Sequence, residues 1–189
     1  MAEGNQFLEH DDPPTLIGEA VLLRALLRED GNETYAGWMN DQGIVEYTES
    51  RFASYTPDEL KRYIQDVRSD PLSHMWAICD VGSGDHVGNI KLGPVNTHHQ
   101  FGDIGLIIGE RSAWGRGFAT EAISLVCDFA FKQLRLHKVT ASMYEENVGS
   151  TRAFEKAGFT IEGIRTSQYL LNDHYTGLVM MGRKASDSL

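Results

Sequence analysis

The residues best suited to chemistry lie in a glycine-rich segment, residues 109–122, which reads Gly-Glu-Arg-Ser-Ala-Trp-Gly-Arg-Gly-Phe-Ala-Thr-Glu-Ala. It joins a predicted strand to a predicted helix. Gly115 and Gly117 let the backbone turn tightly and approach a ligand without obstruction by side chains. The first amides of the helix have no partner inside it and lie at the positive end of its dipole. The segment therefore predicts a binding site for a phosphate or diphosphate group, with a glycine-rich turn that binds nothing as the alternative.

Two common phosphate-binding loops do not fit this segment. A Walker loop needs Lys and then Ser or Thr after its last glycine, where this chain has Phe118 and Ala119. A dinucleotide fingerprint needs a third Gly or Ala where Thr120 stands, and it normally lies in a first βαβ unit. Both loop types are excluded.

A second segment, residues 144–159, reads Tyr-Glu-Glu-Asn-Val-Gly-Ser-Thr-Arg-Ala-Phe-Glu-Lys-Ala-Gly-Phe. A purely structural interpretation is available for it. Asn147 caps a short helix, Ser150 lies in its first turn, and Gly158 ends it. This interpretation does not explain why the segment follows the glycine-rich one at this separation.

Together the two segments resemble the GCN5-related N-acetyltransferases (GNAT), especially the branch with ribosomal-protein and spermidine acetyltransferases. The resemblance extends over the chain after residue 15 and is strongest over residues 103–159. Trp114 to Ala122 is similar to the cofactor loop and helix start of that branch. The positions that fit its second signature are Asn147, Ser150, Arg152, Glu155, Lys156, Gly158 and Phe159.

The resemblance implies that the protein binds acetyl-CoA and needs no metal. The pantetheine arm pairs with the backbone around Ile107 and Ile108, Asn147 binds the same arm, and Ser150 lies near the sulfur. The implied diphosphate-binding positions are Gly115, Arg116, Gly117, Phe118, Ala119 and Thr120.

Acetyl transfer to an amine needs a base, because a primary amine with a pKa of about 10.4 is protonated at neutral pH. Asp103 is the candidate, with a solvent-facing carboxylate as its alternative role and Glu145 and Glu146 as alternative bases. Many family members use a Tyr in the short helix as the acid, but this chain has Phe154 there. Ser150 is the candidate substitute, with helix capping or cofactor binding as its alternative role. A backbone amide near Ile108 suits the oxyanion.

Two features depart from the family pattern. Trp114 stands where many members have Gln or Arg, and residues 109–113 are about one residue longer than expected. The amides that face the diphosphate are therefore defined only to within one position.

The remaining elements follow from hydrophobic periodicity and turn residues. We expect helices near residues 35–39, from a capping box at Thr56 to Val67, at 120–134 and at 150–157. We expect strands at residues 20–23, 74–79, 87–92, 103–108, 138–144, 159–171 and 175–181. The strand at 103–108 is nearly continuously apolar, which predicts burial on both faces.

These elements predict a mixed α/β (α+β) fold with helices on both sides of a central sheet. The resemblance implies that the sheet is mostly antiparallel and splayed between its two central strands. We expect a disordered leader at residues 1–15, a single N-acetyltransferase domain at 16–185 and a short disordered end.

Charge and composition narrow the function. The 27 Asp and Glu against 17 Lys and Arg give a net charge of −10, which disfavours nucleic acid and anionic membranes as partners. Neither a membrane span nor a signal peptide is evident, and Cys79 and Cys127 read as reduced core residues, so we expect a cytoplasmic protein. His98 and His99 read as loop residues and not as metal ligands.

The expected function is acetyl-CoA-dependent N-acetyl transfer to a primary amine by direct attack. The acceptor is a protein N-terminus, a polyamine or a nucleotide-linked amino sugar, and the charge favours a cationic one. His174 is a turn residue or lines the acceptor cleft, and Trp38, Tyr47 and Phe52 serve packing or acceptor contact. The alternative function is a non-catalytic acyl-CoA sensor. A homodimer is a family-level expectation.

Overall fold

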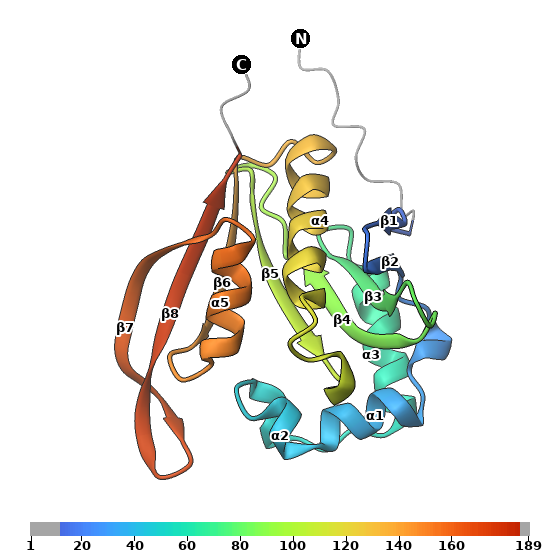
Figure 1. Cartoon of the computed structure of the whole chain (residues 1–189), viewed down its shortest axis with the longest axis horizontal. Coiled ribbons are helices and arrows are strands. Elements are labelled where there is room, and N and C mark those ends of the chain that lie inside the picture. Colours follow the sequence, from blue (N-terminus) through green and yellow to red (C-terminus); the bar gives the residue numbers. More distant parts are fainter. Residues whose placement is uncertain (1–11, 186–189) are drawn as a thin grey trace.

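The computed structural model describes residues 12–185, within which eight strands form one sheet in the order β1-β2-β3-β4-β5-β6-β8-β7 (Figure 1). Every neighbouring pair is antiparallel except β5 and β6, which run parallel. The expected mixed, mostly antiparallel sheet is confirmed. The strands are β1 (Leu16–Ile17), β2 (Val21–Ala25), β3 (His74–Asp80), β4 (His86–Leu92), β5 (Phe101–Ile108), β6 (Lys138–Tyr144), β7 (Thr160–Leu171) and β8 (His174–Lys184).

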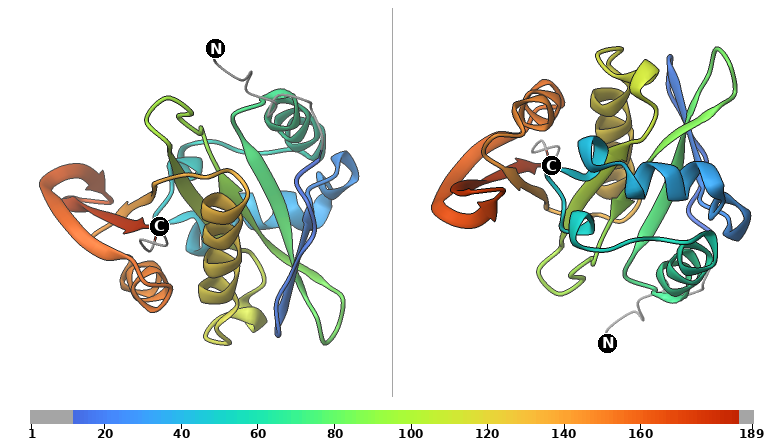
Figure 2. Two further views of the ribbon diagram at one scale, coloured as in Figure 1. Left: turned by 90° about the horizontal axis from the view of Figure 1, so that it is seen from above. Right: turned by 90° about the horizontal axis from the view of Figure 1, so that it is seen from below.

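Helices cover both faces of the sheet, as Figure 2 shows in the views from above and below. Because side chains alternate along a strand, β3 packs on both sides. Trp76 and Ile78 join the core with α4, whereas Met75 and Ala77 join the core with α1 and α3. The α-helices are α1 (Glu33–Asn40), α2 (Gln42–Val45), α3 (Pro57–Ser69), α4 (Phe118–Lys132) and α5 (Val148–Lys156), and the 3-10 helices are η1 (Arg28–Asp30), η2 (Glu49–Phe52) and η3 (Arg111–Ala113).

Local signals in the sequence set the helix ends. Thr56 accepts from the amide of Glu59, and the Glu59 carboxylate accepts from the amide of Thr56, so the predicted capping box of α3 is confirmed. α4 begins at Phe118, two residues before the predicted start, because Gly117 adopts a left-handed φ of 85° at its N-cap. Gly158, with φ 87°, follows α5 as predicted.

The predicted leader at residues 1–15 is described from residue 12 onward. Asp12 pairs with Arg68 (2.6 Å), and the carbonyl of Pro14 accepts from the Trp76 indole (2.9 Å). These two residues of the predicted leader therefore contact the folded core. Residues 1–11 and 186–189 lie outside the described residues.

The central pair of strands separates soon after it forms. β5 pairs with β6 only through Phe101–Asp103 opposite Lys138–Thr140. Beyond this point β5 continues beside β4 and β6 continues beside β8. The splay implied by the family resemblance is confirmed.

The predicted burial of residues 103–108 on both faces is wrong. Leu106, Ile107 and Ile108 are only half-buried, and Gly105 is exposed. Among the described residues no strand pairs with this edge of β5 beyond Asp103, so an apolar strand here borders an opening instead of filling a core.

Within residues 12–185, every helix is too short or too polar to cross a membrane.

Gly109 tests the packing at the end of β5. A Cβ added there overlaps the Trp38 indole, so we expect Gly109→Ala to lower the free energy of unfolding by about 1–3 kcal/mol. Gly37, the neighbour of Trp38 in α1, has open space around its Cβ position, so Gly37→Ala should stabilise the helix by about 0.5–1 kcal/mol. Urea titration measures both; equal stability of the two variants would contradict the packing described here.

Candidate active site

The splay between β5 and β6 has two chemically different faces. Val139, Ala141 and Met143 of β6 pack into the core with α4, so the alternating residues of β6 point to the opposite side. We call these the α4 face and the α1 face. The α1 face of β6 carries three hydroxyl-bearing side chains, those of Thr140, Ser142 and Tyr144.

On the α4 face, a glycine cradle (residues 115–120) precedes and begins α4. Gly115 and Gly117 have φ values of 73° and 85°, which favour glycine, and open space surrounds the Cβ position of each. Among the described residues no side chain caps the helix, so its first amides stay available to an anion. The predicted cradle geometry is therefore present.

The Arg116 guanidinium is not directed into the glycine cradle. Its guanidinium pairs with Asp80 (2.8 Å) and lies 4.3 Å from the centre of the Phe118 ring. The amide of Gly82 and the Arg116 guanidinium hold the pKa of Asp80 below its ordinary value. Arg116 thus fixes the loop to the end of β3 while the cradle presents backbone amides.

The extra length of residues 109–113 forms η3, and Trp114 follows it. The Trp114 indole donates to the carbonyl of Ile108 (2.9 Å). On the other side, the Trp38 indole donates to Glu110 (3.1 Å), and Arg111 pairs with Asp41 (2.8 Å). The loop is therefore held by both β5 and the α1–α2 segment, a role for Trp114 that no sequence signal indicated.

The strand register decides which backbone groups of β5 face the opening. The amide of Gly109 donates to the carbonyl of Val87 (2.9 Å), so alternation directs the backbone groups of Ile107 to β4 as well. The groups of Leu106 and Ile108 point to the opposite edge. Of the two predicted backbone contacts, Ile108 directs its amide to the opening while its carbonyl accepts from Trp114. The backbone of Ile107 is directed to β4 and is not available to a ligand.

Asn147 and Ser150 lie where β6 gives way to α5. The Asn147 side chain accepts from the amide of Ser150 (3.1 Å), as the capping interpretation predicts. Phe154, at the position where many relatives have Tyr, is buried and packs on Phe159 with ring centroids 4.9 Å apart. It has no donor, so Ser150 is the polar candidate of this helix.

Asp103 lies at the closed end of the splay, on the α1 face. Thr140 donates to its carboxylate across the β5–β6 pair (2.8 Å). Burial raises the pKa of Asp103 above its ordinary value, and the hydrogen bond from Thr140 partly offsets this. Asp103 is therefore not the solvent-facing edge carboxylate of the alternative interpretation.

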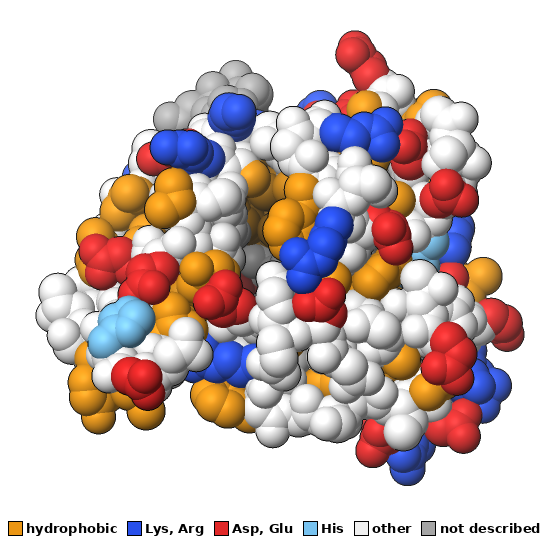
Figure 3. Space-filling model, turned by 60° about the horizontal axis from the view of Figure 1, so that its bottom comes forward, with side chains coloured by type: hydrophobic (Ala, Val, Ile, Leu, Met, Phe, Trp, Pro, Cys, Tyr) orange, Lys and Arg blue, Asp and Glu red, His pale blue; other side chains and the backbone are white. Residues whose placement is uncertain are grey.

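At the open end of the splay lies a cluster of aromatic and charged side chains that the sequence analysis identified only in part. We call it the mouth cluster: Tyr47, Glu49, Arg51, Tyr144 and Tyr169. The Tyr144 ring centroid lies 6.3 Å from that of Tyr47 and 4.9 Å from that of Tyr169. Figure 3 shows this side of the molecule hollowed between the part with β7 and β8 and the remainder, with acidic and basic side chains around an apolar interior.

The remaining residues singled out in the sequence either make specific contacts or lie exposed at the surface. Glu146 pairs with His174 (2.5 Å), which holds the pKa of Glu146 below its ordinary value. Trp38 is buried and serves packing, whereas Phe52 is 71% exposed. His98 and His99 lie in an exposed loop, and within the described residues no three His, Cys, Asp or Glu side chains are placed to hold a metal ion.

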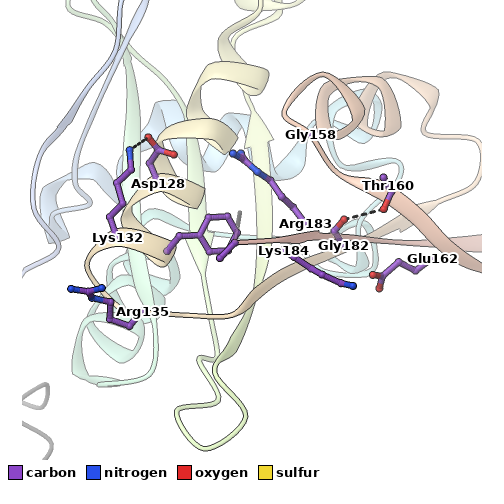
Figure 4. A pocket seen from close by; sticks show the side chains of 11 residues that line it. Asp128, Lys132, Arg135, Gly158, Thr160, Glu162, Gly182, Arg183 and Lys184 are labelled. Carbon is purple, nitrogen blue, oxygen red and sulfur yellow. Dashed lines mark hydrogen bonds and ion pairs between the residues drawn. The ribbon is translucent and has the colours of Figure 1, made fainter. Parts of the chain in front are cut away.

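A separate cavity of about 640 Å³ lies at the far end of α4, between that helix and the ends of β7 and β8 (Figure 4). Lys132 pairs there with Asp128, and Arg183 donates to the carbonyl of Ala157 (2.9 Å). At 1.5 Å per residue, α4 separates this cavity from the glycine cradle by roughly 15 Å. The cavity is therefore distinct from the glycine cradle.

Comparison with known proteins agrees with this arrangement. The model of the acetyltransferase (GNAT) domain matches residues 20–160. The probable N-acetyltransferase YjcK of Bacillus subtilis is 47% identical over 58 residues, which are 31% of this chain and 32% of that protein. The spermidine N(1)-acetyltransferase of Vibrio cholerae is 27% identical over 166 residues, which are 87% of this chain and 93% of that enzyme.

A solved structure extends the comparison to three dimensions. The spermidine N-acetyltransferase from Vibrio cholerae, in complex with CoA and spermine, superimposes with a TM-score of 0.77 at 25% identity. The match covers 87% of this chain and 95% of that chain. The splayed sheet, the glycine cradle and these matches agree, and the chain thus belongs to the GNAT family, as an N-acetyltransferase with acetyl-CoA as its cosubstrate.

Proposed function

We propose that this protein acetylates a primary amine of a small cationic acceptor of the diamine or polyamine class. The observation that carries the proposal is the acidic and aromatic opening on the α1 face. Tyr47, Tyr144 and Tyr169 supply ring faces, which attract ammonium groups, and Glu49 supplies a carboxylate beside them.

Further carboxylates surround this opening. Burial, together with the charges of Glu46 and Glu146, raises the pKa of Tyr47. Glu145 approaches Gly177 on β8. With the chain's net charge of −10, this distribution favours a cation. The Vibrio cholerae relative named for spermidine supports the same acceptor class.

The length of the α1 face also suits an acceptor with two amines. Asp103 is in register with Thr140, and Tyr144 lies four residues further along β6, a rise of about 13 Å. The two terminal nitrogens of a triamine whose extended chain has nine single bonds lie roughly 11 Å apart. One amine beside Asp103 therefore leaves the other within reach of Glu49.

The proposed reaction uses the two faces separately. The cradle amides of residues 115–120 bind the diphosphate, and Asn147 and the backbone of Ile108 bind the pantetheine arm. The amine nitrogen attacks the thioester carbon from the α1 face, the C–N bond forms and the C–S bond breaks. Through intervening water, Asp103 takes the proton that the amine loses, Ser150 donates one to the thiolate, and an outward-facing backbone amide near Ile108, such as that of Leu106, faces the oxyanion.

The cradle is tested by Gly117→Asp. A negative charge about 4 Å from the diphosphate costs ~1–4 kcal/mol, so the affinity for CoA should fall roughly 5- to 1000-fold. Gly158→Asp is the matched control, because Gly158 has the same left-handed backbone but lies beside the far end of α4, away from the cradle. Calorimetry with CoA measures both; an unchanged affinity in Gly117→Asp would remove the cradle from the proposal.

Asp103 is tested by Asp103→Asn. Because its pKa is raised, the wild-type kcat/KM should decline on acidification at a pH above the ordinary Asp range, and the variant should lose that limb together with roughly 100-fold or more of its activity. Because the pKa of Asp103 is higher in the folded than in the unfolded state, its protonated form stabilises the fold. This stabilisation is lost as pH rises through the folded-state pKa. Asp103→Asn should therefore melt no lower than wild type at pH 7. Full activity with an unaltered pH profile would assign the base elsewhere.

Ser150 is tested by Ser150→Ala. If its hydroxyl protonates the thiolate, kcat should fall by about 100-fold while the affinity for CoA changes little. Ser69→Ala in α3 is the control, since the Ser69 hydroxyl bonds only to the carbonyl of Gln65 in its own helix. Stopped-flow detection of free thiol gives kcat. Equal turnover in the two variants would limit Ser150 to a structural role.

The acceptor is identified by a panel of amines mixed with acetyl-CoA and the protein. The panel contains a diamine, spermidine, a peptide with a free N-terminus and a nucleotide-linked amino sugar. We expect release of thiol that depends on the diamine and on spermidine. A preference for the peptide or the sugar would overturn the acceptor class, and CoA binding without thiol release from any amine would overturn the proposed activity.

A further inference from the structure

Arg51 joins three segments that are far apart in the sequence. Its guanidinium donates to the phenol oxygen of Tyr144 (3.2 Å), to the carbonyl of Leu170 (2.7 Å) and to the carbonyl of Glu46 (2.8 Å). It also lies 5.0 Å from the Tyr144 ring centre. These contacts connect η2 and the end of α2 with β6 and with the tip of β7.

Without this side chain, η2 is weakly held, and the strand before the tip of β7 is irregular. η2 has no buried residue, its N-cap Thr48 makes no capping bond, and Phe52 is exposed. The tip of β7 follows an irregular register between Arg165 and Tyr169, with Ser167 at φ 52°. Segments with few buried contacts open at low free energy, so a specific bond is needed to keep one arrangement.

Arg51 also orders the groups that meet the acceptor. The Tyr144 phenol donates to Glu49 at 2.6 Å, a short hydrogen bond to a carboxylate. Burial, together with Glu49, raises the pKa of Tyr144 to about 12, so the phenol keeps its proton at neutral pH. Arg51 donates to the same phenol oxygen and, within the described residues, has no carboxylate at ion-pair distance.

We propose that Arg51 is a positioning residue that determines acceptor binding. By bonding Tyr144 and Leu170 it closes η2 across the open end of the splay and presents the Glu49 carboxylate toward the α1 face. The inference rests on the proposed function, because it assigns Glu49 to the distal ammonium of the acceptor. Arg51 itself touches neither the thioester nor the reacting amine.

Charge alone predicts the opposite effect of removing Arg51. A cation beside a site for a cationic acceptor repels it, so loss of that cation would lower the acceptor KM. Loss of a positioning contact raises KM instead, because the carboxylate and the aromatic rings then have to be ordered on binding. The sign of the change therefore separates the two roles.

The test compares Arg51→Gln, Arg51→Lys and Tyr144→Phe with Arg62→Gln, an exposed α3 variant with the same loss of charge. We expect the acceptor KM to rise at least about tenfold in Arg51→Gln and in Tyr144→Phe, with kcat and CoA affinity within about twofold of wild type. Arg51→Lys keeps the charge but lacks the planar fork, so it should resemble Arg51→Gln. Arg62→Gln should match wild type.

Hydrogen–deuterium exchange provides a readout that needs no acceptor. Amides in residues 46–52 and 169–173 should exchange faster in Arg51→Gln than in Arg62→Gln. An unchanged or lower KM, rescue by Arg51→Lys, or unchanged exchange in these segments would each overturn the inference. If no amine in the panel is a substrate, the proposed function fails, whereas exchange and CoA affinity still test the closure by Arg51.

Discussion

The three residue pairs that join β5 to β6 are the constraint on which the site depends. β5 is held to β4 by five pairs and β6 to β8 by seven, so each strand follows its own half of the sheet once Asp103 and Thr140 are passed. The edge of β5 beyond this point presents backbone amides that no strand of the described residues pairs, whereas the Ile108 carbonyl accepts from the Trp114 indole. In the proposed reaction, the amide-rich arm of the thioester supplies partners for these amides, and the amine reaches the same gap from the other face.

Residues 33–52 connect the two halves around this gap. Trp38 and Asp41 hold the loop after β5 through Glu110 and Arg111, whereas Arg51 holds the ends of β6 and β7. The segment beside the proposed acceptor site is thus bonded to the loop that precedes the glycine cradle.

Local signals made much of the fold predictable. The capping box at Thr56, the left-handed glycine at Gly158 and the cap at Asn147 each depend on a few neighbouring residues, and all three are found. The burial of residues 103–108 was predicted wrongly, because an apolar run does not distinguish a core strand from one that borders a binding cleft. Arg51 and Tyr144, 93 residues apart, meet only through tertiary structure, so periodicity and spacing carried no signal for their contact.

The most direct test is a crystal structure of the protein with CoA and an unreactive diamine analogue. We expect diphosphate oxygens about 3 Å from amides of residues 115–120, the thiol between β5 and β6, and the analogue on the α1 face between Asp103 and Glu49. A nucleotide bound away from the start of α4, or an analogue on the same face as the nucleotide, would contradict it.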